Sequence, residues 1–278
     1  MSTHSDGTSD NSKGENEGLR DEGAVLLEQS GPVAMLTLAR PAALNALSWA
    51  MYRQLQEHLE RLAGDEGVRV LVVRGAGKAF AAGTDIQQFV GFNGEDGIAY
   101  ERHMEEVLSG LYSFPRPTIA AVHGYAVGAG LVIATACDLR YASPSSRFGA
   151  PIARTLGNCL SLKNYRRIAG AFGAMRAREM LFTGRLLSAA EALQCGFLTA
   201  IYEQEQLFAQ VFEVAQQISA NAPLTLWAAK EADRRLAEAG AETEIAYDDV
   251  VRRVYGSQDF REGVAAYLEK RKPQWTGQ

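Results

Sequence analysis

The segment Pro117-Thr-Ile-Ala-Ala-Val-His-Gly-Tyr-Ala-Val-Gly-Ala-Gly130 carries the clearest structural signal in the chain. Its run Thr118-Ile-Ala-Ala-Val122 has the length and composition of a strand, and Pro115 and Pro117 before it act as breakers. A glycine turn follows, and the apolar segment from Leu131 to Ala136 then predicts a fully buried helix. A strand that leads through a glycine turn into a helix is typical of an α/β protein.

Towards the N-terminus the same alternation of strands and helices occurs again. Ser48 is a candidate cap for an amphipathic helix that stops at Gly64, and a β-branched strand follows it. Because strands that alternate with helices pair side by side in one direction, we expect a parallel sheet opened by a hairpin. The predicted elements are a hairpin over 24–40, a helix over 48–64, a strand over 68–73 and a helix over 97–112.

The C-terminal half predicts one more strand, over 138–142, and beyond about residue 158 the signals are wholly helical. The last helix carries Val264, Tyr267 and Leu268 close to the end of the sequence, so it either folds back or packs on another subunit. The predicted helices cover 159–169, 174–182, 188–195, 204–220, 223–238, 243–254 and 259–271. We expect a disordered acidic tail over 1–22, an α/β core over 23–205 and a helical C-terminal region over 206–278.

Composition excludes several classes of protein. The formal net charge of the 278 residues is -5. Residues 1–22 hold six acidic and two basic side chains, a net charge of -4, so the rest of the chain is nearly neutral. It therefore lacks the surplus of basic residues that is typical of a nucleic-acid-binding protein. Neither a signal peptide nor a membrane-spanning run is evident, and we expect a cytoplasmic protein. Cys137, Cys159 and Cys195 lack paired spacing, which indicates buried thiols and neither disulfides nor a metal site.

Two glycine-bearing segments, 75–86 and 124–131, each follow a predicted strand. Neither matches a nucleotide-binding motif, because the first lacks the earlier glycine of a P-loop and the second lacks the third glycine of a dinucleotide fingerprint. Each alone is read equally well as an ordinary tight turn. Together they present unpaired N–H groups at two helix starts, with small residues that let a ligand oxygen approach the backbone, which is how an oxyanion hole is built.

Five motifs in order resemble the crotonase superfamily of enoyl-CoA hydratases and isomerases from about residue 23 onward. They are ARPAALNALS (39–48), KAFAAGTDI (78–86), PTIAAVHGYAVGAG (117–130), CDLRYAS (137–143) and REGVAAYLEKRKP (261–273). The resemblance implies a spiral of ββα units with a helical trimerisation region, assembled as a homotrimer or a dimer of trimers. It also implies an acyl-CoA thioester as substrate, with no permanently bound cofactor.

The same resemblance assigns roles to individual positions. The two oxyanion donors are the backbone N–H groups of Thr84 and Ala129. At Ala42 and Gln87, two basic residues often found near the CoA phosphates are absent. Asp85 also suits the cap of a helix after the first turn. The implied CoA-contacting residues are Ala43, Leu44, Ala82, Asp85 and Ile86, together with Tyr267 and Lys270, which could reach CoA across a subunit boundary.

The chain departs from the hydratase pattern at both catalytic glutamates, which are replaced by Val132 and Ile152. A pair of carboxylates adds water across the conjugated double bond, and losing both raises the barrier by roughly 3 to 5 kcal/mol if nothing replaces them. His103 is a candidate base, although a solvated helix face explains it better. Arg154 and Asn158 are candidates to line the pocket, although roles in a turn or a salt bridge explain them better. Cys159 is a candidate nucleophile, although a buried thiol explains it better.

These observations leave three hypotheses. The leading one is an enoyl-CoA hydratase/isomerase-type enzyme that stabilises a thioester enolate, for which simple hydration is doubtful. The second is another enolate reaction, such as isomerisation, decarboxylation or thioester hydrolysis, with His103 or a glutamate of residues 101–106 as base. The third is an acyl-CoA-binding or scaffold protein without catalysis.

Overall fold

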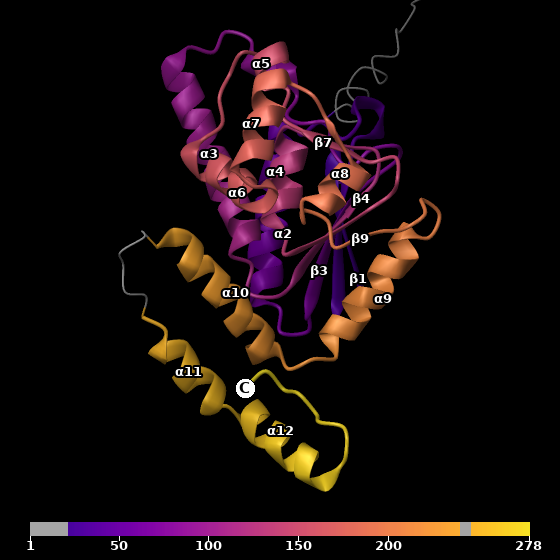
Figure 1. Cartoon of the computed structure of the whole chain (residues 1–278), viewed down its shortest axis with the longest axis vertical. Coiled ribbons are helices and arrows are strands. Elements are labelled where there is room, and N and C mark those ends of the chain that lie inside the picture. The colour runs from indigo at the N-terminus through magenta and orange to yellow at the C-terminus, as the bar shows by residue number, and fades with distance from the viewer. Residues whose placement is uncertain (1–21, 240–245) are drawn as a thin grey trace, which may run out of the picture.

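The computed structural model describes residues 22–239 and 246–278, arranged as an α/β body with a helical C-terminal extension (Figure 1). The acidic tail predicted over 1–22 lies outside these residues except for Glu22, as does part of the helix predicted over 243–254. No helix in the described part of the chain is both long and apolar enough to cross a membrane.

A six-stranded sheet forms the centre of the body. Its order is β1-β2-β3-β4-β6-β9, antiparallel between β1 and β2 and parallel from there on. The predicted hairpin and parallel sheet are therefore confirmed. The strands are β1 (Ala24–Ser30), β2 (Val33–Ala39), β3 (Val70–Gly75), β4 (Thr118–Val122), β6 (Leu139–Ala142) and β9 (Ala200–Ile201).

Three short strands form a second sheet in the order β5-β7-β8. They are β5 (Tyr125–Val127), β7 (Arg147–Gly149) and β8 (Leu187–Ser188). The prediction that the chain is wholly helical beyond residue 158 is therefore wrong, because β8 and β9 lie there. Each has only two residues, so neither shows a periodicity, and both exist through pairing with distant strands.

Alternating side chains of the central strands feed two hydrophobic clusters, one on each face of the sheet. On one face Ala34, Leu36 and Leu38 of β2 pack with helices α2 (Trp49–Gly64), α3 (Gly94–Tyr112) and α4 (Ala129–Ala136). On the other face, Val33 packs with Leu207, Val211 and Ala215 of α9 (Leu207–Ser219). Figure 1 shows these helices on opposite sides of the sheet. Helix α9, which the sequence groups with the C-terminal region, thus covers the body.

Helix boundaries follow local capping. The predicted Ser48 cap is confirmed, since its Oγ accepts the N–H of Met51, and the helix ends at Gly64. The helix predicted over 159–169 begins at Leu162 instead, because Ser161 caps it by accepting the N–H of Asn164. The other helices of the body are α5 (Ile152–Thr155), α6 (Leu162–Phe172), α7 (Ala174–Thr183) and α8 (Ala189–Gln194).

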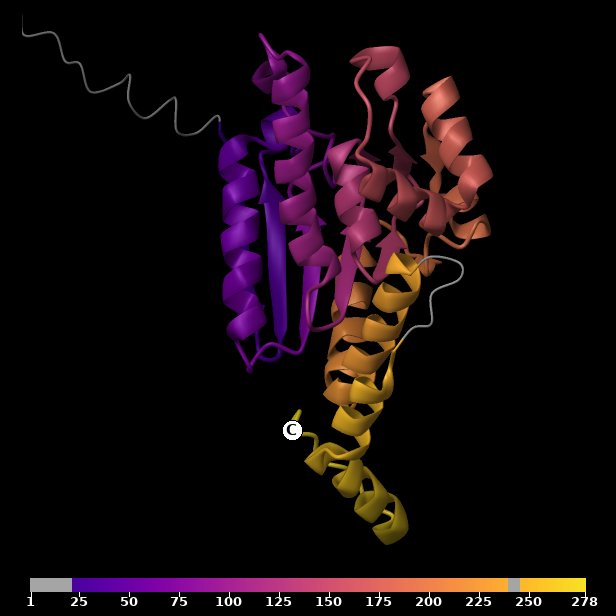
Figure 2. The same cartoon turned by 90° about the vertical axis from the view of Figure 1, so that its left-hand side faces the viewer.

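The last three helices are α10 (Pro223–Glu238), α11 (Asp248–Tyr255) and α12 (Gln258–Glu269). The predicted bounds of α10 are confirmed. Figure 2 shows that α12 projects beyond the edge of the sheet, at the opposite end of the molecule from α5. Tyr267 and Leu268 on α12 remain 84% and 74% exposed, so α12 does not fold back to bury its apolar face in the described chain.

Candidate functional site

A cavity of about 220 Å³ lies where the two glycine-bearing segments meet. The first segment leaves β3 and the second links β4 to α4, so adjacent parallel strands bring them to the same edge of the sheet. Helices α3 and α5 close the other sides. The lining includes four residues predicted to form the site, namely Thr84, Ala129, Val132 and Ile152.

Backbone hydrogen bonds hold the two segments together. The Ala81 N–H donates to the carbonyl of Tyr125 at 2.9 Å, and the Val127 N–H donates to the carbonyl of Ala81 at 3.0 Å. A Cβ atom at Gly130 would lie only 2.2 Å from the Ala81 carbonyl oxygen, so this approach requires glycine. The separation of the two segments is therefore fixed by the main chain and is independent of flexible side chains.

Two backbone N–H groups border the cavity without an acceptor. Leu47 forms backbone hydrogen bonds to both neighbours of Thr84: its N–H donates to the Gly83 carbonyl at 2.8 Å, and its carbonyl accepts the Asp85 N–H at 3.0 Å. Because successive N–H groups of an extended chain point in opposite directions, the Thr84 N–H points away from Leu47. Ala129 is the first residue of α4, where N–H groups have no partner within the helix. Within the described ranges, neither N–H donates to another residue. Two donors thus remain for an oxygen atom in the cavity.

The Thr84 side chain belongs to a chain of three hydroxyl groups. Its Oγ1 lies 2.6 Å from the hydroxyl of Tyr52 on α2 and 2.8 Å from that of Tyr100 on α3. Burial raises the pKa of both tyrosines above the usual phenol range. Both phenols therefore stay protonated near neutral pH and fix the loop without acting as bases.

Val132 and Ile152 give the cavity an apolar wall. Val132 lies one turn into α4 and is only 2% exposed, and Ile152 begins α5. Neither side chain can exchange a proton or hold a water molecule by hydrogen bonding. Chemistry that needs a carboxylate at these two positions is therefore closed to this cavity.

Glu101 is the one carboxylate among the lining residues of this cavity in the described chain. Burial raises the pKa of Glu101, the Ser161 N–H opposes the shift, and the nearby Glu105 adds to it. The sequence-based hypothesis names the glutamates of residues 101–106 together as possible bases, and Glu101 alone among them lines the cavity. The spacing of apolar residues in the sequence could have singled out Glu101. Met104 and Leu108 mark the inward face of α3, and Glu101, three and seven residues before them, lies on the same face of the helix.

The remaining predicted residues are scattered. The His103 ring packs 5.8 Å from the ring of Trp49, and His103 does not line the cavity. The Arg154 side chain lies against Gly184, away from it. Asn158 and Cys159 do line it. The expectation of a buried Cys159 is wrong, because this loop residue is exposed, and Cys195 is partly buried. Only Cys137 is a buried thiol, and burial raises its pKa to about 12.

The residues predicted to contact CoA form two separate groups. The Ala82 N–H donates to the Leu44 carbonyl at 3.0 Å, and both Ala82 and Ile86 line the cavity. Ala43 directly precedes Leu44. Asp85 caps the short helix Ile86–Phe89, as predicted, and pairs with Arg40 at 2.7 Å, which lowers the pKa of the Asp85 carboxyl. Tyr267 and Lys270 lie at the far end of the molecule, on and just after α12.

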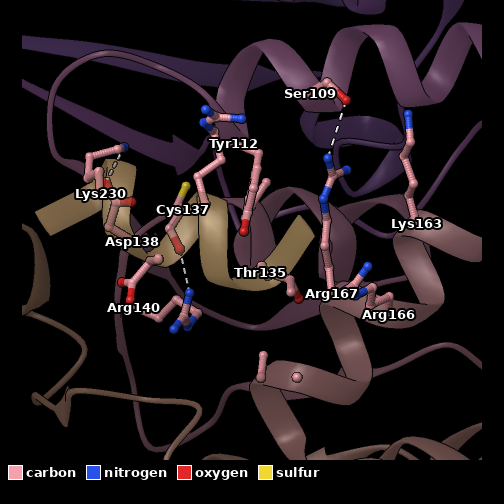
Figure 3. Close-up of a pocket in the computed structure, with 16 residues that line it drawn as sticks. Ser109, Tyr112, Thr135, Cys137, Asp138, Arg140, Lys163, Arg166, Arg167 and Lys230 are labelled. Carbon is pink, nitrogen blue, oxygen red and sulfur yellow. Dashed lines mark hydrogen bonds and ion pairs between the residues drawn. The ribbon is translucent and has the colours of Figure 1, made fainter. Parts of the chain in front are cut away.

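A larger cavity of about 680 Å³ lies between α6 and α10 and is lined by basic side chains (Figure 3). Several of these side chains form ion pairs and hydrogen bonds within the protein. Lys230 of α10 pairs with Asp138 at 2.5 Å and donates to the Arg116 carbonyl at 3.0 Å, and Arg140 donates to the Phe197 and Cys137 carbonyls. This cavity lies at the interface between α10 and the body, and its polar side chains help to hold the two together. Among the described residues, no three His, Cys, Asp or Glu side chains gather as metal ligands would.

Comparisons with known proteins agree with this architecture. Residues 28–278 match the family model described as enoyl-CoA hydratase/isomerase. The short-chain-enoyl-CoA hydratase of Clostridium acetobutylicum is 32% identical over 250 residues, which cover 89% of this chain and 95% of that protein. The 2,3-dehydroadipyl-CoA hydratase of Escherichia coli is 32% identical over 256 residues, covering 91% and 98%.

Solved structures give the same result for the fold. The crystal structure of an enoyl-CoA hydratase/carnitine racemase from Magnetospirillum magneticum superposes with a TM-score of 0.85 at 35% identity, covering 91% of this chain and 96% of that one. An enoyl-CoA hydratase from Geobacillus kaustophilus gives 0.83 at 33% identity, covering 93% and 100%. The predicted crotonase fold with a helical C-terminal region is thereby confirmed. The chain belongs to the enoyl-CoA hydratase/isomerase family.

Proposed function

We propose that the protein is an enzyme that binds an acyl-CoA thioester in the cavity beside Thr84 and Ala129 and stabilises its enolate. The observation that carries this proposal is the pair of N–H groups without acceptors on two glycine-bearing segments that border one cavity. A thioester oxygen held there gains negative charge when the α proton leaves, and fixed donors stabilise that charge. The names of the relatives, which include hydratases of short-chain-enoyl-CoA and of 2,3-dehydroadipyl-CoA, support a CoA thioester as substrate.

We propose a reaction that transfers a proton at the α carbon, as double-bond isomerisation does. We expect the addition of water to the double bond to be slow. The resemblance assigns the two hydratase glutamates to the positions of Val132 and Ile152. Both side chains line the cavity, and an apolar wall does not order a water molecule. Decarboxylation and thioester hydrolysis could use the same two N–H groups, and their products, carbon dioxide and free CoA, distinguish them from isomerisation.

We assign the loop residues Ala43, Leu44, Ala82, Asp85 and Ile86 to CoA binding. This assignment is supported by the contact of Leu44 with Ala82 and by the position of Ala82 and Ile86 on the cavity wall. Tyr267 and Lys270 are too remote from the cavity of their own chain, and we propose that they serve the cavity of a neighbouring copy in a homotrimer or a dimer of trimers.

Ala129→Pro tests the central proposal, because it removes one N–H donor at the position where a helix tolerates proline best. We expect the rate of α-proton exchange between acyl-CoA and D₂O to fall about 10²- to 10³-fold, the usual effect of losing one oxyanion donor. Nuclear magnetic resonance of the thioester measures this rate.

Ala174→Pro is the matched control. Ala174 is also the first residue of a helix, also follows a glycine, and is exposed on α7 away from the cavity. Its exchange rate should equal that of the wild type. Unchanged exchange in Ala129→Pro would refute the proposed oxyanion site, and hydration of 2-enoyl-CoA by the wild type faster than α-proton exchange would refute the proposed reaction.

A further inference from the structure

We infer that Glu101 is the catalytic base of this site, taking the place of the carboxylates absent at Val132 and Ile152. The inference rests on the proposed enolate chemistry and adds the group that moves the proton. Glu101 reaches the site from α3, an element that contributes neither of the two N–H groups, so it approaches the bound thioester from another side.

One carboxylate oxygen of Glu101 is fixed by a hydrogen bond, and the other has none within the described chain. Its Oε2 accepts the N–H of Ser161 at 2.9 Å, at the start of α6. Its Oε1 has no hydrogen-bond partner among residues 22–239 and 246–278, while the residue lines the cavity. One oxygen therefore orients the group and the other is available to a substrate proton.

The surroundings of Glu101 suit a base that works near neutral pH. Met104 and Leu108 beside it on α3 are 3% and 1% exposed, and Val132 and Ile152 line the same cavity. Desolvation in this apolar cavity raises the pKa of Glu101. A base whose pKa lies nearer to the working pH accepts a proton from carbon more readily than an ordinary exposed glutamate.

Other titratable side chains nearby fit this role less well. The Tyr100 hydroxyl is engaged with Thr84 at 2.8 Å, and burial raises its pKa, so it remains protonated. His103 packs on Trp49 outside the cavity. Cys159 lies in an exposed loop. Asn158 and Asn164 line the cavity, but an amide cannot accept the proton.

The step balances without any further reactant. Oε1 of Glu101 takes the α proton, the electron pair of the broken C–H bond moves to the thioester oxygen, and the enolate is held by the N–H groups of Thr84 and Ala129. Glu101, now a carboxylic acid, has two ways to complete the reaction. If its proton first exchanges with water, the proton it returns to the α carbon comes from solvent, which is measured as exchange. If it delivers its proton to the γ carbon of a bound 3-enoyl-CoA, the double bond shifts to the 2 position.

Glu101→Gln is the decisive variant, because the amide oxygen still accepts the Ser161 N–H while proton transfer is lost. We expect α-deuterium incorporation into butyryl-, 3-hexenoyl- and phenylacetyl-CoA to fall about 10²- to 10⁴-fold, with dissociation constants from calorimetry changed by no more than about threefold. Glu101→Asp keeps a carboxylate and should retain part of the exchange. Glu106→Gln, exposed on the same helix, should match the wild type.

Exchange by Glu101→Gln at the wild-type rate would overturn the inference while leaving the proposed function intact. A wild type that binds the three thioesters and exchanges none of them would also overturn it, and would reduce the proposed function to binding. Absence of binding to all three would overturn the proposed function itself. If Glu101→Gln does not fold, Glu101→Ala takes its place. Loss of exchange in a folded Glu101→Ala that binds like the wild type, with partial exchange in Glu101→Asp, supports the inference, and wild-type exchange in Glu101→Ala overturns it.

Discussion

At the scale of single residues, the half-buried carboxyl group of Glu101 couples folding to pH. Burial raises its pKa above the ordinary value of 4.5, and the charges around it are those of Glu105 on the same helix, with the Ser161 N–H facing it from α6. A carboxyl group with a higher pKa in the folded state binds its proton more tightly there than in the unfolded chain. Glu101 therefore stabilises the fold below its unfolded pKa, and this contribution is lost as the pH rises through its folded pKa.

Glu101→Gln removes that titration and so provides the comparison. We expect the free energy of unfolding of the wild type, relative to Glu101→Gln, to fall as the pH rises from about 4.5 through the acid range. Urea unfolding of both proteins over this range measures the difference. Glu106→Gln, exposed on the same helix, should run parallel to the wild type. A wild type whose stability relative to Glu101→Gln rises with pH would show that the folded state favours the ionised carboxylate.

At the scale of elements, Lys230 links α10 to the sheet. Lys230 pairs with Asp138 (Figure 3) and donates to the Arg116 carbonyl. Asp138 in turn accepts the Thr118 N–H at 2.6 Å at the start of β4. The Lys230 and Asp138 side chains are 14% and 29% exposed, so the pair lies between a surface and a buried ion pair. Its loss should cost about 1–2 kcal/mol.

Lys230→Met should therefore loosen α10 without unfolding the body. We expect amide hydrogen exchange in α10 to accelerate about tenfold, the equivalent of about 1.4 kcal/mol, while the amides of β4 keep their protection. Lys163→Met is the matched control, because Lys163 pairs with Glu105 at 3.4 Å and is 66% exposed. Equal protection of α10 in both variants would mean that the Lys230 pair does not hold α10 in place.

Elements also mark how far the sequence predicts this structure. The long helices and β1 to β4 follow from local periodicity and caps, and α10 has its predicted bounds. Strands β5, β7, β8 and β9 have two or three residues each and arise from pairs such as Tyr141 with Ala200, which lie far apart in sequence. No local pattern encodes such a pairing.

The site divides in the same way. The meeting of the segments that hold Thr84 and Ala129 was predictable, because glycine turns after adjacent parallel strands reach one edge of the sheet. The base was not. His103 attracts attention by its side-chain chemistry, but it stands two residues from Glu101, roughly 200° around the helix, and faces Trp49 instead of the cavity. Which face of α3 borders the cavity depends on the packing of α3 against α4, a tertiary contact.

At the scale of the whole molecule, α12 leaves an apolar surface uncovered. Val264, Tyr267 and Leu268 are 47%, 84% and 74% exposed. The last residues cover a different part of α12, where the buried carboxylate of Asp259 accepts the N–H groups of Thr276 and Gly277 at 2.7 and 2.9 Å. The proposed homotrimer accounts for the remaining apolar surface, because it lets α12 of one copy pack against the next.

The double variant Tyr267→Asp, Leu268→Asp tests this assembly by placing two charges on that surface. Burying an unpaired charge costs several kcal/mol. We therefore expect sedimentation equilibrium to show a trimeric or hexameric wild type and a largely monomeric variant. If Tyr267 and Lys270 contact CoA in a neighbouring copy, the affinity of the double variant for acyl-CoA must fall when the assembly dissociates into monomers. Leu26→Asp, an exposed apolar position on the edge strand β1, controls for added charge and should change neither. A wild-type monomer that binds acyl-CoA would contradict the proposal, because Tyr267 cannot then reach any occupied site.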